Sequence, residues 1–282
     1  MSGSSPVNFL YKFRACSEAE QRHHLADTLL RQKLWFAARS SLNDPLELKP
    51  RLTTVAPKEA VRAYAKYLEQ NYSRDKKLSP AKRLQIRDQA TRQVQRQPDF
   101  LEPEMHRLLG EVGVLCLCES YKFSNMWAHY ADNSTGLCLE FDAGLGLFLH
   151  AQPVTYVPDY PVANRLLDTN DVLLQKSMFT KHQSWQTEHE WRVIARPASE
   201  RHREKFIDDP STPDGLKDFY RQERGFGEYT FPIEALTGII LGEKFSQRSW
   251  LDKILDKMHS RPALYQAVTK AGAYDTHRIS IS

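Results

Sequence analysis

The chain has 282 residues, of which 41% are apolar and 26% are charged, a composition typical of a soluble globular protein with a substantial core. No apolar run approaches the roughly 20 residues that a membrane-spanning helix needs, and the first residues lack the basic-then-apolar pattern of a secretory signal. We therefore predict a cytoplasmic protein with no membrane contact. The net charge of +4 does not by itself indicate a nucleic-acid partner.

The first 45 residues predict a strand, a helix and a second strand. Residues 8–14 alternate apolar and polar side chains, which is typical of a strand. A capping-box pattern at Ser17 begins a helix over residues 17–30, and the apolar residues 34–38 indicate a second strand. The polar residues 40–45 then predict a turn, because Asn and Asp side chains bond to the nearby backbone.

Residues 57–110 differ from the rest in composition and predict a basic helical insertion. Helical spacing indicates helices over residues 58–72 and 80–96, the second of them capped at Ser79. Basic residues outnumber acidic ones over residues 58–96, so this segment is a candidate contact for a nucleic acid or a protein acceptor. The alternative is an ordinary solvated helical face.

The remainder of the chain adds further strands and helices. We predict strands over residues 113–117, 136–141 and 238–242, and helices over residues 125–132, 172–182 and 247–260. The sum is a single α+β domain over residues 1–282, with a mainly antiparallel sheet core, helices segregated around it and the helical insertion at about 57–110.

An acidic segment at residues 185–195 is the strongest candidate for chemistry. It is predicted to lie on or beside a strand, and alternation would then place Glu188, Glu190 and Arg192 on one face. Such a face is costly to bury unless its charges are paired. The alternative is a solvated edge strand with one internal ion pair.

Three further polar clusters accompany this segment. The motifs of phosphate-binding glycine loops, serine nucleophile elbows, zinc helices and calcium loops are missing from the sequence, and we predict no metal site. Trp127 and Tyr130 share a helical face, a spacing that fits either core packing or a ligand platform. The candidate binding residues of the three clusters are Tyr11, Lys12 and Arg14; Ser41 and Asn43; and Trp127, His129 and Tyr130.

Four motifs in order resemble the bacterial family of unknown function numbered 2971. The resemblance extends from about residue 9 to residue 245 and implies no activity. Its motifs are Leu10-Tyr11-Lys12-Phe13-Arg14, Leu34-Trp35-Phe36 with Leu42-Asn43-Asp44-Pro45, Met126-Trp127-Ala128-His129-Tyr130-Ala131 with Gly136 and Phe141-Asp142, and Trp185 with Glu188-His189-Glu190-Trp191-Arg192.

A more distant resemblance, to ADP-ribosyltransferases, implies an activity. Those enzymes open with a Leu-Tyr-His-Tyr-Thr type of strand, which Leu10-Tyr11-Lys12-Phe13 resembles, and carry Glu-x-Glu at a late strand. The resemblance implies an ADP-ribosyltransferase-like fold, NAD as substrate, Glu190 as the catalytic carboxylate and Glu188 preceding it. Lys12 stands where a histidine or arginine is usual, and no Ser-Thr-Ser element follows the second strand.

The residue types suit the cleavage of NAD. A carboxylate near the ribose stabilises the positive charge that develops as nicotinamide leaves. Trp127 and Tyr130 would contact the nicotinamide ring. Lys12, Arg14 and Arg192 would meet the diphosphate or, for Arg192, neutralise Glu190. We therefore predict an NAD-consuming ADP-ribosyltransferase or NAD glycohydrolase, in a role such as bacterial defence.

Two other function classes stay open at this point. A metal-dependent nuclease would use scattered carboxylates and the basic insertion to hydrolyse a phosphodiester. A non-catalytic interaction module would instead use the aromatic residues as core. The carboxylates and the lysine of the nuclease alternative are Asp44, Asp132, Asp142, Glu188, Glu190 and Lys181.

Overall fold

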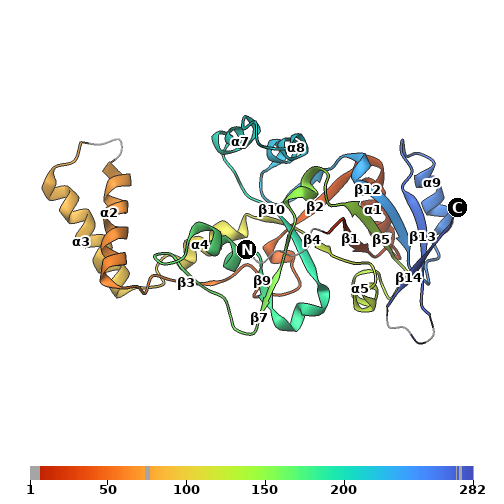
Figure 1. The fold of residues 1–282 in the computed structure, drawn as a ribbon, viewed down its shortest axis with the longest axis horizontal. Coiled ribbons are helices and arrows are strands. Elements are labelled where there is room, and N and C mark those ends of the chain that lie inside the picture. The colour runs from red at the N-terminus through yellow and green to blue at the C-terminus, as the bar shows by residue number, and fades with distance from the viewer. Residues whose placement is uncertain (1–6, 74–76, 271, 273–274, 282) are drawn as a thin grey trace. The chain divides into compact units, whose positions relative to one another are not determined.

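The computed structural model describes residues 7–73, 77–270, 272 and 275–281, which fold into two compact units (Figure 1). The first unit contains Met1–Leu42, Glu111–Val154 and Gln183–Ser282, and the second contains Asn43–Gly110 and Thr155–His182. The predicted insertion at 57–110 thus lies within the second unit, which also takes up a later part of the chain.

The first unit is built on one large sheet in the order β11-β2-β4-β1-β5-β12-β13-β14, with β10 on β4 and β6 on β10. Among the described strands of this sheet, β12 and β13 pair in parallel and the others pair antiparallel. The predicted α+β class with a mainly antiparallel sheet is therefore confirmed. The strands are β1 (Phe9–Arg14), β2 (Lys33–Ala38), β4 (Gly113–Cys118), β5 (Leu137–Asp142), β6 (Gln152–Pro153), β10 (Glu190–Ala195), β11 (Gly227–Thr230), β12 (Leu236–Leu241), β13 (Ala263–Val268) and β14 (His277–Ser280).

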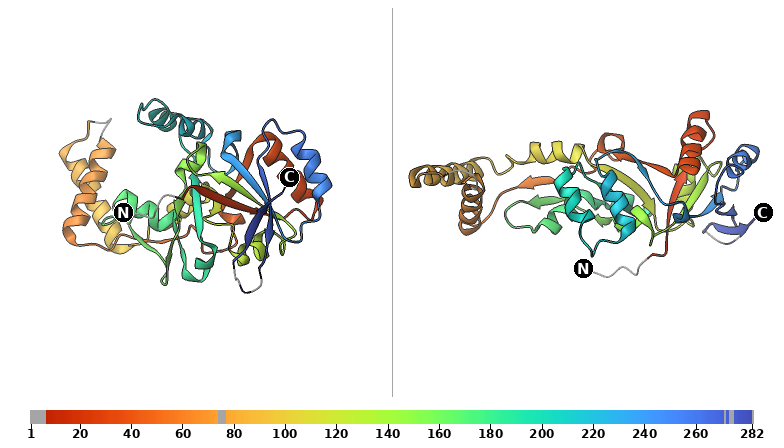
Figure 2. Two further views of the ribbon diagram at one scale, coloured as in Figure 1. Left: turned by 45° about the vertical axis from the view of Figure 1, so that its right-hand side comes forward. Right: turned by 90° about the horizontal axis from the view of Figure 1, so that it is seen from above.

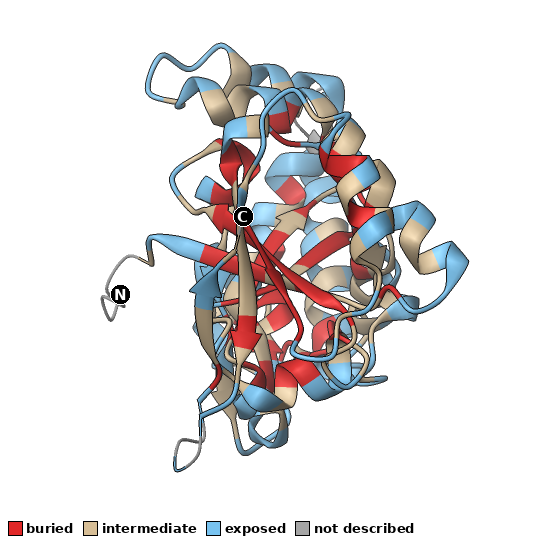
Figure 3. Ribbon diagram, turned by 90° about the vertical axis from the view of Figure 1, so that its right-hand side faces the viewer, coloured by how far each residue is buried: buried red, intermediate tan, exposed pale blue. Residues whose placement is uncertain are grey.

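Apolar side chains of the central strands form the main core of this unit. The ribbon of buried residues is red in Figure 3. Leu115, Leu139 and Ile239 come from β4, β5 and β12 and are fully buried, as expected for a sheet with covered faces. Helices α1 and α9 pack against each other beside the sheet (Figure 2). The helices are α1 (Ala19–Arg31), α5 (Ser124–Tyr130), α7 (Glu200–Ile207), α8 (Asp214–Gln222) and α9 (Arg248–Leu255), with 3-10 turns η1 (Arg39–Ser41), η2 (Gly146–His150), η3 (Gln183–Glu188) and η4 (Ile233–Ala235).

The predicted cap at Ser17 is wrong by one residue. Helix α1 begins after Glu18, whose backbone N–H donates to the Gln21 side chain at 3.1 Å. The Ser17 hydroxyl instead donates to Asp132. A long-range hydrogen bond thus competes with the local capping pattern.

The second unit combines short parallel strand pairs with helices. Strand β3 (Arg51–Thr53) pairs with β8 (Val162–Asn164), and β7 (Thr155–Val157) pairs with β9 (Thr180–His182). The predicted helix over 172–182 ends earlier, because Phe179 caps it and the next residues join β9. The helices of this unit are α2 (Lys58–Ser73), α3 (Pro80–Arg96), α4 (Glu102–Gly110) and α6 (Asn170–Met178).

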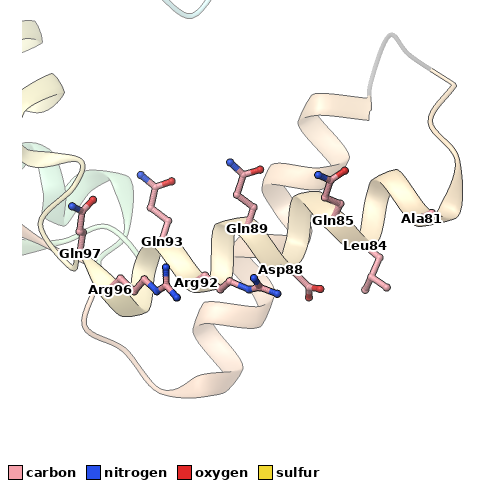
Figure 4. Close-up of a pocket in the computed structure, with 9 residues that line it drawn as sticks. All are labelled: Ala81, Leu84, Gln85, Asp88, Gln89, Arg92, Gln93, Arg96 and Gln97. Carbon is pink, nitrogen blue, oxygen red and sulfur yellow. The ribbon is translucent and has the colours of Figure 1, made fainter.

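Helices α2 and α3 confirm the predicted helical part of the insertion. Ser79 caps α3, since its hydroxyl accepts from the Lys82 N–H at 3.3 Å. Part of the basic excess is neutralised locally, because the buried Glu69 of α2 accepts from Arg87 of α3 at 2.8 Å. The exposed surface of α3 carries a row of glutamines, the arginines Arg92 and Arg96 and the apolar Leu84 (Figure 4).

Among the described residues, no helix combines the length and the apolar composition that crossing a bilayer requires.

A half-buried histidine makes the stability of the first unit sensitive to acid. Burial and the nearby Arg196 lower the pKa of His150 to about 4. In the unfolded chain a histidine takes up its proton near pH 6.5, so the stabilising contribution is complete above that pH and is lost as the pH falls towards 4. We expect His150→Phe to reduce the loss of unfolding free energy between pH 7 and pH 4.5 by on the order of 2 kcal/mol, measured by urea titration. An unchanged pH dependence would contradict this account.

Candidate functional site

Strand β4 is the element around which the predicted motifs assemble. Strand β10 pairs along one of its edges, from Glu190 opposite Cys118 to Ala195 opposite Gly113. Strands β1 and β2 share the other edge: Tyr11 pairs with Cys118, whereas Ala38 pairs with Gly113. Because β1 and β2 diverge, neither strand pairs with residues 115–117 in the part of the chain that the structure describes.

Lys12 of β1 reaches this unpaired part of β4. Its ammonium donates to the Cys116 carbonyl at 2.7 Å. Burial and the neighbouring Arg14 lower the pKa of Lys12 to about 8, while the Cys116 thiol and the Glu190 carboxylate partly oppose that shift. Lys12 is therefore within electrostatic reach of both Arg14 and Glu190.

Glu190 and Arg192 form a buried ion pair on β10. The guanidinium donates through Nε to Oε1 at 2.8 Å and through Nη2 to Oε2 at 3.0 Å. Arg192 is 0% exposed and Glu190 is 5% exposed. This bidentate geometry holds the carboxylate in one orientation, and the positive charge stabilises its ionised form.

Glu188 does not share the strand face of Glu190, contrary to the alternation predicted for residues 185–195. Residues Gln183–Glu188 form the 3-10 turn η3, and His189 adopts a left-handed conformation with φ 46°. The His189 ring stacks on Phe123 at 4.1 Å, which supports this turn. The strand therefore begins only at Glu190, and tertiary contacts override the pattern of alternation.

The Glu188 carboxylate instead meets helix α5. It accepts a hydrogen bond from the Tyr130 hydroxyl, and the amide of Asn125 donates to the Thr187 carbonyl at 2.8 Å. Glu188 and Tyr130 were both candidate site residues, and the structure brings them into direct contact. His129, on the same helix, is exposed.

Trp127 is a core residue rather than a ligand platform. Its ring is 2% exposed, meets Phe13 edge-on at 5.1 Å and donates through Nε1 to the Tyr121 carbonyl at 2.7 Å. Helix α5 packs this face against β1, so the spacing of Trp127 and Tyr130 places Trp127 in the core. The prediction that Trp127 contacts nicotinamide is therefore wrong.

Tyr11 belongs to a cluster that the sequence did not reveal. Alternation along β1 separates Tyr11 from Lys12 and Arg14, and the Tyr11 hydroxyl donates to the buried Glu140 at 3.0 Å. Arg278 of β14 also donates to Glu140. Burial and the Glu140 carboxylate raise the pKa of Tyr11. The sequence indicates this cluster only by Glu140, an acidic residue within the apolar strand at 137–141.

Arg14 lines a cavity of about 370 Å³ in the first unit. Burial lowers the pKa of its guanidinium. Trp35 of β2, which is exposed, and Thr28 of α1 line the same cavity. Trp35 was not among the predicted site residues, although Leu34 and Phe36, its buried neighbours, imply that it faces the other side.

Ser41 and Asn43 do not join this group. The Ser41 hydroxyl donates to the Ala38 carbonyl at 2.8 Å, and Ala38 pairs at the end of β4 opposite to Glu190, five residues or about 17 Å away along the strand. Asn43 is the first residue of the second unit. The structure therefore places the Glu190–Arg192 pair on β10 and Lys12 on β1, at opposite edges of β4. Tyr11 and Glu190 both pair with Cys118, so Tyr11 shares the strand face of Glu190, whereas Lys12 and Arg14 lie on the other face.

The fold and these contacts define an α+β protein with a buried pairing of acid and base beside its central strand. The family model described as "Protein of unknown function (DUF2971)" matches residues 126–193. This segment runs from α5 to β10 and contains Tyr130, Glu188, Glu190 and Arg192. The match supports the family predicted from the sequence. No curated protein and no solved structure matches the chain.

Proposed function

We propose that this protein consumes NAD, as an ADP-ribosyltransferase or an NAD glycohydrolase, with Glu190 as the catalytic carboxylate. The observation that carries the proposal is that strand β4 connects the charged groups: Glu190 pairs with Cys118, and the Lys12 ammonium donates to the Cys116 carbonyl. Arg14 follows Lys12 by two residues on β1. One acid and two cations are the groups that a ligand with a ribose and a diphosphate needs.

Glu190 has the chemistry that the transition state needs. As nicotinamide leaves, positive charge develops on the ribose, and an oriented carboxylate stabilises that charge more than it stabilises the ground state. Arg192 donates one hydrogen bond to each oxygen of the Glu190 carboxylate, which fixes its orientation.

Lys12 and Arg14 would bind the diphosphate, and Trp35 would stack on the adenine. Arginine suits phosphate because its donors form a planar fork. The cavity beside Arg14 is about 370 Å³, which lies within the range of small-molecule sites. The exposed ring of Trp35 in its lining offers a flat apolar surface.

The acceptor and the biological role remain predictions from the resemblance. The exposed basic residues of α2 and α3 are the candidate contact for a nucleic-acid or protein acceptor.

The carboxylates of the nuclease alternative make separate local contacts: Asp44 accepts from the Leu46 N–H at 2.9 Å, and Asp142 accepts from the Gly144 N–H at 2.7 Å. The geometry therefore favours the NAD proposal.

Nicotinamide release from NAD tests the proposal. We expect the purified chain to release nicotinamide from NAD, either in buffer, where water is the acceptor, or after a cell lysate has been added to supply another acceptor. We expect Glu190→Gln to lower kcat by about 100- to 1000-fold. Glu69→Gln is the matched control, because Glu69 is also a buried glutamate bonded to an arginine but lies in the second unit. It should retain full activity.

Arg14→Met separates binding from chemistry. This variant leaves the Glu190–Arg192 pair intact, and we expect it to raise KM for NAD at least about tenfold with little change in kcat. Equal nicotinamide release by the wild type and by folded Glu190→Gln would refute the catalytic role. Circular dichroism of each variant identifies those that fold.

A further inference from the structure

A second cavity, of about 280 Å³, lies entirely within the second unit. Its walls come from the loop at 44–50, the loop at 158–161 and the end of α6 with β9. All of these segments belong to the same unit, so this cavity is separate from Glu190 and from the cavity beside Arg14.

Ser177 on α6 is a buried polar group that faces this cavity without a protein partner. The residue is 4% exposed and lines the cavity. Its hydroxyl has no hydrogen-bond partner among the described residues. Serines inside helices commonly bond to the carbonyl four residues earlier, and a buried hydroxyl without a partner is unfavourable. A bound molecule would satisfy it.

The lining of the same cavity includes a buried ion pair, so groups of opposite charge lie side by side there. Glu47 and Lys181 are 5% and 6% exposed, and Lys181 Nζ lies 3.7 Å from Glu47 Oε1. Both residues line the cavity. A carboxylate accepts hydrogen bonds and an ammonium donates them, so a ligand that meets both must carry a donor beside an acceptor.

The lining of the cavity includes an aromatic ring, which suits a flat ligand. Tyr160 is an exposed aromatic residue in the lining, and its hydroxyl donates to the Lys49 carbonyl. That bond holds the ring in place, while Pro158 and Pro161 flank it in the lining. Aromatic faces stack readily on heterocycles.

We propose that this cavity binds an aromatic heterocycle that carries an amide-type edge, with a hydrogen-bond donor beside an acceptor. Nicotinamide and the nucleobases share this chemistry. The donor of the ligand meets Glu47, its acceptor meets Lys181, and Ser177 supplies a further hydrogen bond. The volume lies near the lower end of small-molecule sites, about 300 Å³, which suits a ligand of one or two rings. The inference does not depend on the proposed cleavage of NAD.

Ligand-detected NMR titrations of the full chain test the proposal. The probes are nicotinamide, adenosine and a single-stranded DNA oligonucleotide, with nicotinic acid and acetamide as comparators. We expect nicotinamide or adenosine to bind at least about tenfold more tightly than nicotinic acid, whose carboxylate would meet Glu47, and than acetamide, which has no ring. If the oligonucleotide binds more tightly than adenosine, the natural ligand is a base within a nucleic acid. If adenosine binds more tightly, the natural ligand is a free small molecule.

Variants locate the binding. Ser177→Leu fills the cavity and should weaken binding at least about tenfold, and Ser177→Ala, which keeps the fold, should weaken it about three- to tenfold. Glu190→Gln should bind the probes as the wild type does, because it lies in the first unit. Ser177→Leu should keep any nicotinamide-releasing activity, so failure of one proposal is distinguishable from failure of the other.

The proposal is overturned if none of the three probes binds at about 10 mM. It is also overturned if Ser177→Leu and Ser177→Ala leave the affinity unchanged, or if Glu190→Gln alone abolishes binding.

Discussion

Arg192→Met is expected to lower the free energy of unfolding by about 3–5 kcal/mol. The substitution removes both hydrogen bonds that the guanidinium donates to Glu190 and leaves a buried carboxylate without that cation. Removing one partner of a buried ion pair is costly because the remaining charge has lost the opposite charge beside it, and water does not reach the buried site to solvate it. Chemical denaturation of the wild type and the variant measures this effect.

Two matched changes separate the ion pair from general damage. Arg248→Met removes a partly exposed arginine that donates to the partly exposed Asp252 at 2.8 Å, and we expect it to cost less than about 1 kcal/mol. The double variant Glu190→Leu with Arg192→Met should recover most of the lost stability, because an apolar pair of similar volume can replace a buried ion pair. A single Arg192→Met variant as stable as the wild type would refute a structural role of the pair.

Trp127→Ala is expected to cost a similar amount, about 3–5 kcal/mol. The variant loses a buried ring, its edge-on contact with Phe13 and its hydrogen bond to the Tyr121 carbonyl. The cavity that it leaves cannot collapse easily, because helix α5 and strand β1 both line it. Thermal unfolding followed by circular dichroism checks the magnitude.

Trp127→Phe tests whether the ring also binds a ligand. Phenylalanine keeps much of the packing, so this variant should fold and retain the KM of the wild type for NAD. A raised KM together with unchanged stability would restore the ligand role that the buried position of Trp127 contradicts.

The elements that the sequence predicts well are those with strong local patterns. The apolar runs of β4 and β12 and the Ser79-capped helix α3 appear nearly as predicted, because their hydrophobic spacing and caps do not depend on distant contacts. Strands β11, β13 and β14 were not predicted. Their residues are largely half-buried or exposed, so they carry little of the alternation that marks a strand.

The site was predictable only in part. Glu190 and Lys12 are 178 residues apart in the sequence, and the resemblance to a known motif suggested their association before the pairing of strands brought them to β4. The contact of Glu140 with Arg278 joins residues 138 positions apart and carries no local signal. The left-handed His189 likewise depends on its stacking with Phe123, which no spacing rule foretells.

A crystal structure with a non-hydrolysable NAD analogue tests the central claim most directly. We predict that the hydroxyls of the nicotinamide ribose lie within about 3 Å of the Glu190 carboxylate and that the diphosphate lies against Lys12 and Arg14. An analogue bound at full occupancy elsewhere in the molecule, with Glu190 bonded to Arg192 and remote from the ligand, would contradict the account.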